Sequence, residues 1–202
     1  MFITFEGGEG TGKTTLINRL KKHFEEQGKV IVVTREPGGS MITEKIRNLL
    51  LDPKNTDITY HTETLLYAAS RAQHLDEVII PALKENKLVL CDRYLDSSLA
   101  YQGYARKLGY DFVLKINNYA TRYIPDITFY IDLDPNIGLN RILNRINKDR
   151  LDMEEMDFHK LVREGYLDIA KLYPNRIIKI RGNQAIESII NAVLSEIKER
   201  LW

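Results

Sequence analysis

Short apolar runs alternate along the chain with segments whose apolar residues recur at helical spacing. The runs cover residues 2–6 (FITFE), 29–34, 87–92, 127–133 and 176–180. Several of them are almost continuously apolar, which is typical of strands that are covered on both faces. The alternation therefore predicts an α/β fold, in which a parallel sheet carries helices on both faces.

The segments between these runs predict the helices. In the first of them Leu16, Leu20 and Phe24 share one face, and Gly28 is expected to end the helix because glycine is common just after helix C-termini. Pro81 is expected to bend or end a long third helix. Helices are predicted near residues 16–24, 42–50, 63–83, 111–123, 135–145, 154–172 and 186–201.

Composition narrows the class of protein. The 202 residues are 44% hydrophobic and 28% charged with a net charge of +1, which indicates one globular domain over residues 1–202. This balance gives no reason to expect a nucleic-acid or membrane partner. Cys91 is the single cysteine, so an internal disulfide and a zinc site built on two thiolates are excluded. With no signal-peptide pattern and no apolar run of about 20 residues, we expect a cytoplasmic protein.

Residues 7–14, which we call the phosphate loop, read GGEGTGKT and complete the pattern G-x-x-x-x-G-K-[ST]. The loop follows a predicted strand and opens a predicted helix, the context in which backbone N–H groups and a helix N-terminus bind phosphate. Lys13 is expected to reach the β- and γ-phosphates, and the Thr14 hydroxyl to bind Mg²⁺. A glycine-rich turn without function is the alternative, which motif and context disfavour. The expected ATP-binding residues are Gly7, Gly8, Glu9, Gly10, Thr11, Gly12, Lys13, Thr14 and Thr15.

The phosphate loop alone does not define the reaction. A GTPase would normally also carry D-x-x-G and N-K-x-D. The first is missing, and residues 147–150 (NKDR) lack the final acid of the second. An ATPase motor of this length is less expected than a small kinase. A kinase needs a second phosphate site, a carboxylate on the metal side and cations that neutralise the transferring group.

A second candidate site begins where the run 87–92 ends. Asp92 is expected to hold Mg²⁺ or its water, and Arg93 to grip an acceptor phosphate with two hydrogen bonds. The alternative is a surface ion pair or helix cap, but strand ends in such sheets favour ligand contact. TREPGG, residues 34–39, ends another predicted strand, and its Arg35 is a further candidate for binding the acceptor phosphate. Arg47 either belongs to the same phosphate site or lies on a solvated helix face.

Four stretches together resemble the thymidylate kinase family of nucleoside monophosphate kinases. They are FEGGEGTGKTT, TREPGG, LLYAASRAQH and DRYLDSSLAYQG, in the order of the family and over nearly the whole chain. The resemblance implies a three-layer P-loop NTPase fold with a five-stranded parallel sheet, a short lid and a homodimer. It implies phosphorylation of dTMP to dTDP, with ATP as donor and Mg²⁺ as cofactor.

The resemblance also assigns acceptor-binding residues. Glu9 matches an acid that contacts the deoxyribose 3′-hydroxyl, although a solvated loop charge would otherwise be expected there. Tyr67, where many relatives have Phe, matches the residue that stacks on thymine, and Arg71 the one that hydrogen-bonds the base. Helical spacing alone would make Tyr67 a core residue and Arg71 a solvated charge.

Three further residues belong to the same implied site. Ser98 and Gln102 match positions that read the edge of the base. Tyr101 matches an aromatic residue beside the sugar, which disfavours a 2′-hydroxyl because an added polar group would lack a partner there.

Residues 141–152 (RILNRINKDRLD), which we call the lid segment, contain Arg141, Arg145, Lys148 and Arg150. They would ordinarily form a solvated helix end. Gly10, however, stands where one branch of the family has an arginine, and the other, bacterial-type branch takes its catalytic cation from the lid. We expect Arg145 or Arg150 to fill that role, beside Lys13, Asp92 and Arg93, and Arg141 to lie against adenine.

Two other functions remain open from the sequence. A deoxynucleoside kinase would phosphorylate thymidine itself and would need a carboxylate base, and the several arginines near the acceptor argue against it. A module that binds ATP without transferring phosphate would be expected to have lost Lys13, Asp92 or the lid, all of which are intact.

Overall fold

The computed structural model describes residues 1–143 and 149–201. Within them, five parallel strands form one sheet in the order β2-β3-β1-β4-β5. The sheet confirms the predicted fold class, and each predicted strand is present with small shifts at its ends. The strands are β1 (Phe2–Glu6), β2 (Ile31–Arg35), β3 (Leu88–Asp92), β4 (Ile127–Asp132) and β5 (Ile177–Arg181).

The strand register brings the carboxyl ends of the central strands together. Phe5 pairs with Asp92 across β1 and β3, and Arg35 pairs with Asp92 across β2 and β3. Glu6 pairs with Tyr130 on the other side of β1. From β1 the chain adds β3 and β2 on one side of the sheet and β4 and β5 on the other, so the strand order reverses direction at β1. The loop after β1 therefore leaves the sheet at the position where ligands bind in open α/β folds.

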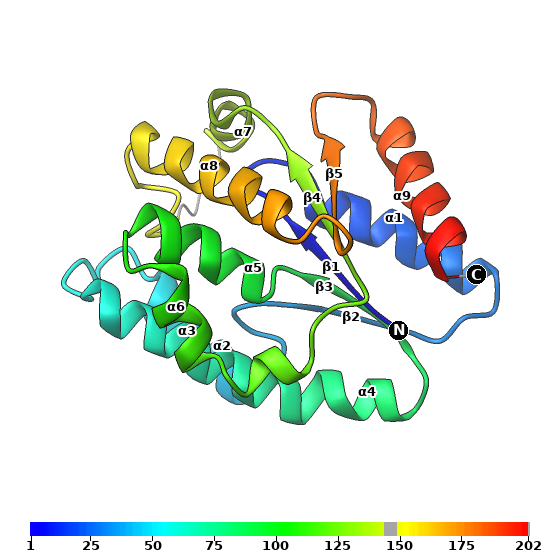
Figure 1. The fold of residues 1–202 in the computed structure, drawn as a ribbon, viewed down its shortest axis with the longest axis horizontal. Coiled ribbons are helices and arrows are strands. Elements are labelled where there is room, and N and C mark those ends of the chain that lie inside the picture. The colour runs from blue at the N-terminus through cyan, green and yellow to red at the C-terminus, as the bar shows by residue number, and fades with distance from the viewer. Residues whose placement is uncertain (144–148, 202) are drawn as a thin grey trace.

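Helices cover both faces of the sheet (Figure 1). On one face α1 (Lys13–Glu26) and α9 (Ile186–Leu201) share an apolar core with β1, β3, β4 and β5, and Leu16, Leu20 and Phe24 are buried as predicted. Burying each such side chain contributes about 1.5–3 kcal/mol. On the other face the apolar core joins β1 and β3 to α3 (Tyr60–His74), α4 (Ile80–Lys84), α5 (Leu95–Ser98) and α8 (Met156–Leu172).

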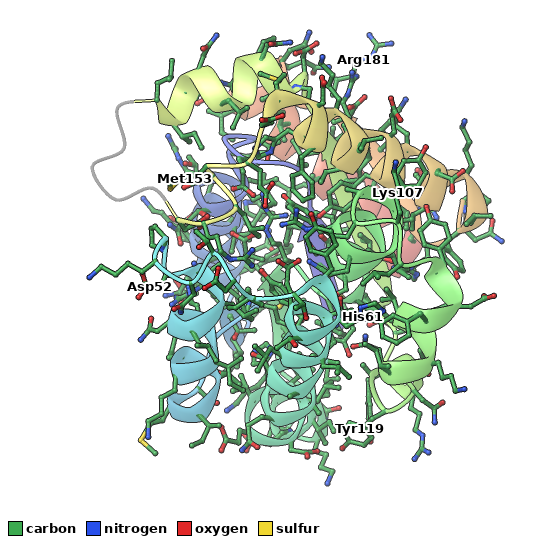
Figure 2. The ribbon with its side chains drawn as sticks, turned by 90° about the vertical axis from the view of Figure 1, so that its left-hand side faces the viewer. Asp52, His61, Lys107, Tyr119, Met153 and Arg181 are labelled. Atoms are coloured by element: carbon green, nitrogen blue, oxygen red, sulfur yellow. The ribbon has the colours of Figure 1, made fainter. Side chains whose placement is uncertain are left out.

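The remaining helices flank these layers. They are α2 (Met41–Leu51), α6 (Tyr110–Ile116) and α7 (Pro135–Ile142). Figure 2 shows α2 and α3 side by side, with Asp52 at the end of α2 and Met153 beyond the lid segment on the same side of the molecule. Among the described residues, no helix combines the length and the apolar character that crossing a membrane requires.

Pro81 does not end the long third helix, which runs to Lys84. A π-helical turn, Leu75–Ile79, comes just before it, and the Ile80 N–H donates to the carbonyl of Leu75. Proline has no N–H to donate to the preceding turn, so a widened turn accommodates it without stopping the helix. Of the two expectations, that Pro81 bends or ends the helix, the second is wrong, and the helix geometry changes in the turn just before the proline.

The predicted helix 111–123 is interrupted. It consists of α6 and a short 3₁₀ turn, Ala120–Arg122. Asn117 follows α6, and its Nδ2 donates to the carbonyl of Val113 at 2.9 Å, a side-chain bond that competes with helix continuation. A second π-helical segment, Leu99–Ala105, extends α5 and was not among the helices predicted from the apolar pattern.

Candidate functional site

The phosphate loop connects β1 to α1 and is closely packed against α7. Gly10 has φ +66°, and a Cβ built on it would lie 2.0 Å from the carbonyl oxygen of Gly138. A Cβ on Gly138 would in turn lie 2.2 Å from the carbonyl oxygen of Glu9. A side chain at Gly10 would force the backbone of α7 to move, so the present packing of α7 disfavours an arginine at this point of the loop.

The side chain of Lys13 lies back across the phosphate loop. Its Nζ donates to the carbonyls of Gly7 at 3.0 Å and Gly8 at 3.1 Å and to Thr11 Oγ1 at 3.2 Å. Burial and the neighbouring Arg93 charge lower the pKa of Lys13. These are weak carbonyl and hydroxyl partners for a buried ammonium group, and an anionic phosphate would be a stronger one.

Thr14 and Asp92 meet beside the loop. The Thr14 hydroxyl donates to Asp92 Oδ2 at 3.1 Å, between the start of α1 and the end of β3. One hydroxyl and one carboxylate are hard oxygen donors of the kind Mg²⁺ takes alongside phosphate oxygens. Thr14 and Asp92 therefore fit a magnesium ion, which they would hold and which would supply positive charge to a bound nucleotide.

Arg93 is held by the phosphate loop. Its backbone has φ +70°, which is uncommon for a residue with a side chain. Nη1 donates to the Gly7 carbonyl at 2.8 Å and Nη2 to Glu9 Oε1 at 2.6 Å, while the guanidinium carbon lies 5.1 Å from the centre of the Tyr101 ring.

Glu9 also accepts the Tyr101 hydroxyl at 2.9 Å. Although burial opposes it, the charges of Arg93 and Lys13 hold the pKa of Glu9 down at about 2. Glu9 is therefore an ionised acceptor at neutral pH, and it faces the ring of the residue expected beside the sugar.

Behind Arg93 lies a second, fully buried acid. Glu6 accepts the Tyr94 N–H at 2.7 Å, the Ser97 hydroxyl at 2.6 Å and the Tyr166 hydroxyl at 2.9 Å. Burial and the nearby Asp96 charge raise the pKa of Glu6 to about 7. Arg93 Nη1 also approaches the Tyr166 hydroxyl at 3.2 Å, so Glu6 supports the arginine through one intermediate group.

Arg71 is buried, with 1% of its surface exposed, and not solvated as spacing alone would suggest. Nε donates to Glu36 Oε2 at 2.7 Å and Nη1 to Asn117 Oδ1 at 2.6 Å. Nη2 donates to the Tyr94 carbonyl at 3.2 Å and to Ser98 Oγ at 2.9 Å. Four of the five N–H donors of an arginine are thus satisfied by described residues, and one is left for a ligand.

These groups share one cavity of about 350 Å³, which we call the nucleotide cavity. It runs from the phosphate loop to the buried Arg71. Tyr67, 8% exposed, lies in its wall, and burial raises the pKa of the Tyr67 hydroxyl. Predicted residues that line it are Glu9, Gly10, Thr11, Gly12, Lys13, Thr14, Thr15, Arg35, Arg47, Tyr67, Arg71, Asp92, Arg93, Ser98, Tyr101 and Gln102.

Comparison with known proteins points to one family. A family model described as thymidylate kinase matches residues 5–193. A thymidylate kinase of Acholeplasma laidlawii (strain PG-8A) is 59% identical and covers 100% of both chains, and one of Clostridium novyi (strain NT) is 50% identical and covers 98% of both. This chain belongs to the thymidylate kinase family.

The fold agrees with a solved member of the thymidylate kinase family. The crystal structure of thymidylate kinase from Ehrlichia chaffeensis is similar with a TM-score of 0.81 and 34% identity, and covers 98% of each chain. The family resemblance inferred from the four motifs is confirmed, and with it the assignment to the nucleoside monophosphate kinases.

The two cations expected beside the second phosphate site, Arg35 and Arg47, lie at the end of β2 and on α2. Arg35 Nη2 donates to Glu44 Oε1 at 2.8 Å, and Arg47 Nη1 donates to the Pro37 carbonyl at 2.8 Å. Both line the cavity, so Arg47 is not confined to a solvated face. Burial and the neighbouring Arg35 charge lower the pKa of Arg47.

The lid arginines expected from the thymidylate kinase family are dispersed. Arg141 Nη1 donates to the Gly10 carbonyl at 3.2 Å, beside the phosphate loop. Arg150 Nε donates to the Leu50 carbonyl at 2.9 Å and Nη2 to Glu63 Oε2 at 2.5 Å. Its neighbours Asp149 and Leu151 line the nucleotide cavity, whereas Arg150 itself does not. Arg145 and Lys148 lie outside the described residues.

Three acids at the site were not assigned from the sequence. Glu36 stands within the quoted TREPGG stretch, accepts from both Arg71 and His74, and lines the nucleotide cavity. Glu6 ends the first strand directly before the phosphate loop, and this position in the sequence could have identified it as a site residue. Glu63 gave none, because an acid in the first turn of a helix is an ordinary solvated residue.

Proposed function

We propose that this enzyme transfers the γ-phosphoryl group of ATP to dTMP, which yields dTDP and ADP. The observation that carries the proposal is the continuity of the nucleotide cavity, which joins a phosphate loop to a buried arginine with one free donor. A donor phosphate and a nucleobase acceptor can therefore share one enclosed space. Membership of the thymidylate kinase family supports dTMP as the acceptor.

Thymine fits the chemistry of the inner end of the cavity. The remaining N–H of Arg71 is suited to a base carbonyl, and Tyr67 provides a ring wall beside it. The Gln102 amide nitrogen donates to Glu63 Oε1 at 2.9 Å, which leaves the amide oxygen as the end available to a ligand. The edge of thymine presents one donor, N3–H, to such an acceptor. The Ser98 hydroxyl accepts a hydrogen bond from Arg71 and so helps to orient this arginine toward the edge of the base.

The sugar and the acceptor phosphate would lie between the two ends of the nucleotide cavity. Glu9 is ionised and accepts hydroxyl donors such as Tyr101 OH, so it is suited to a 3′-hydroxyl. Arg93 is placed to hold the acceptor phosphate, with Arg35 and Arg47 as further cations from the β2 side. The Tyr101 ring occupies the space beside the sugar, where an additional 2′-hydroxyl would lack a partner.

Catalysis then rests on position and charge. An anionic phosphate oxygen of dTMP attacks the γ-phosphorus in line, and the bond to the β,γ-bridging oxygen breaks; no general base is needed because the nucleophile is already deprotonated. Lys13 and Arg93 offset charge on the transferring group. Thr14 and Asp92 would hold Mg²⁺, which supplies additional neutralisation of the ATP phosphates when bound.

The lid arginines complete the proposed machinery. Arg141 would lie against adenine, and its contact with the Gly10 carbonyl of the phosphate loop supports that role. Arg145 remains a prediction from the family pattern. Arg150 would have to exchange Glu63 for the γ-phosphate to act directly, and Arg150→Ala against Arg145→Ala in single-turnover kinetics would separate the two. The residue that supplies the cation should show the larger loss of rate.

We also propose a homodimer through α2 and α3. Met41 is 74% exposed, Leu49 46% and Leu65 51%, so both helices carry large apolar side chains in solvent. Sedimentation of the wild type and of Leu65→Glu would test this, and a monomeric wild type would contradict it. A cytoplasmic location and the lack of a nucleic-acid or membrane partner stay predictions from the sequence.

A coupled assay for ADP decides the proposed function. With ATP and Mg²⁺, dTMP should be turned over faster than dUMP, dCMP, dAMP and dGMP, and thymidine should not be phosphorylated. Turnover of thymidine without dTMP would favour the deoxynucleoside kinase. Equal or better use of another monophosphate would overturn the choice of acceptor, and no ADP with any acceptor would favour an ATP-binding module.

A further inference from the structure

Glu63 in the first turn of α3 is the most buried acid beside the nucleotide cavity without an assigned role. It has 0% exposure and does not line the cavity. Its two oxygens have different partners. Oε1 accepts Gln102 Nε2 at 2.9 Å, whereas Oε2 accepts Arg150 Nη2 at 2.5 Å and Arg106 Nη2 at 3.5 Å.

This arrangement determines which way the Gln102 amide points. A carboxylate with two guanidinium partners accepts hydrogen bonds and cannot donate one, so only the NH₂ end of the amide can face it. Gln102 lines the nucleotide cavity, and its carbonyl oxygen is the end that remains for the ligand. Without Glu63, both orientations of the amide would be open, and Gln102 could present a donor instead.

We propose that Glu63 is a positioning residue that sets base selectivity, because it locks the Gln102 amide with its acceptor toward N3 of the base. The proposal rests on the contact between Gln102 and the base in the proposed function. Glu63 does not line the cavity, yet it would control whether the enzyme accepts a base that carries hydrogen on N3.

A single substitution should reverse the lock. In Glu63→Gln, the new carboxamide must direct its oxygen at Arg150 and Arg106, because both are donors. Its NH₂ end then faces Gln102 and donates to the Gln102 carbonyl oxygen. The Gln102 amide turns over, and its NH₂ group points into the nucleotide cavity, where it opposes N3–H but matches an N3 lone pair.

The probe is 5-methyl-2′-deoxyisocytidine 5′-monophosphate. It keeps the C4 carbonyl and C5 methyl group of dTMP but has an unprotonated N3. We would measure kcat/KM for dTMP and for this probe and take their ratio. The ratio should fall at least about tenfold in Glu63→Gln relative to the wild type, the factor expected when one buried hydrogen bond becomes mismatched. Loss of overall rate, which the disturbed Arg150 also causes, cancels in the ratio.

Two control variants make the result specific. Glu154 is the second acid that pairs with Arg106, and it does not contact Gln102. Glu154→Gln should therefore leave the ratio within about twofold of the wild type. Glu63→Asp keeps a carboxylate acceptor and should retain the preference for dTMP. A ratio that is unchanged in Glu63→Gln, or that falls equally in Glu63→Asp, would overturn the proposal.

Gln102→Leu separates this inference from the proposed function. If that variant alters the ratio and Glu63→Gln does not, only the role of Glu63 is wrong; if neither alters it, the contact of Gln102 with the base is wrong as well. Should Glu63→Gln not fold, a neutron crystal structure of the wild type with dTMP decides, because it distinguishes the amide nitrogen from the oxygen. The amide nitrogen must stay on Glu63 with the oxygen about 2.7–3.2 Å from N3, and an amide turned away from Glu63 overturns the proposal.

Discussion

Alanine substitutions at the glycines of the phosphate loop should separate backbone strain from contact with α7. Gly10 combines both effects, since its φ is +66° and its Cβ would lie 2.0 Å from the carbonyl oxygen of Gly138. At Gly12 φ is +88°, but nothing lies within 4 Å of the added atom. Gly138 has the contact without the unusual φ, and a Cβ on Gly8 meets nothing within 4 Å. The chain thus contains its own set of matched controls.

The expected losses in free energy of unfolding follow from these differences. A left-handed alanine costs about 1–2 kcal/mol, a forced contact about 1–3 kcal/mol, and replacing glycine returns about 0.4–1 kcal/mol by restricting the unfolded chain. Gly8→Ala should therefore stabilise by about 0.5 kcal/mol, Gly12→Ala destabilise by about 0.5–1, Gly138→Ala by about 1–2, and Gly10→Ala by about 2–4 kcal/mol.

The assay is urea unfolding of the nucleotide-free enzyme, followed by circular dichroism, with free energies extrapolated to water. Nucleotide must be absent, since ligand binding would add to the stability of the folded state. If Gly10→Ala costs no more than Gly12→Ala, the close packing of α7 on the phosphate loop contributes nothing, and the physical reason given for the missing arginine is wrong.

Other substitutions test the charges of the site. Lys13→Ala should lower kcat at least about 100-fold, and wholesale unfolding in a thermal melt would contradict its functional role. Arg93→Ala should raise KM for dTMP more than KM for ATP; unchanged dTMP kinetics would count against it. The pKa of Glu6 is about 7 against an ordinary 4.5, so the folded state binds the proton more tightly and stability falls as pH rises between these values. In Glu6→Gln this loss of stability, about 1–3 kcal/mol in the free energy of unfolding, should largely disappear. Urea unfolding at about pH 5 and pH 8 measures it, and a variant with the same pH dependence as the wild type would refute the role of Glu6.

The sequence predicted the sheet and the phosphate loop because their signals are local. Continuous apolar runs identify buried strands, and the loop motif is complete within residues 7–14. Asp92 and Arg93 could be placed because a strand end adjoins the loop in any such sheet. The Tyr67 and Gln102 assignments came from the family pattern, and the structure places both side chains in the wall of the nucleotide cavity.

The parts that could not be predicted depend on partners distant in sequence. Arg71 is buried because Glu36, Tyr94, Ser98 and Asn117 converge on it, and helical spacing contains no information about them. The contact between Arg150 and Glu63 spans 87 positions, so the charge pattern of the lid could not reveal it. The helix continues past Pro81 because a π-helical turn, which has no clear sequence signature, accommodates the proline.

The ion pair between Arg93 and Glu9, 2.6 Å long, has a consequence for turnover. An acceptor phosphate that arrives at Arg93 would displace an anionic partner already present, so binding would be an exchange of anions and not the neutralisation of an isolated cation. Such an exchange weakens ground-state affinity, and it gives the arginine somewhere to return when the product departs. An enzyme that must release a diphosphate more highly charged than its substrate benefits from a built-in competitor for its own cation.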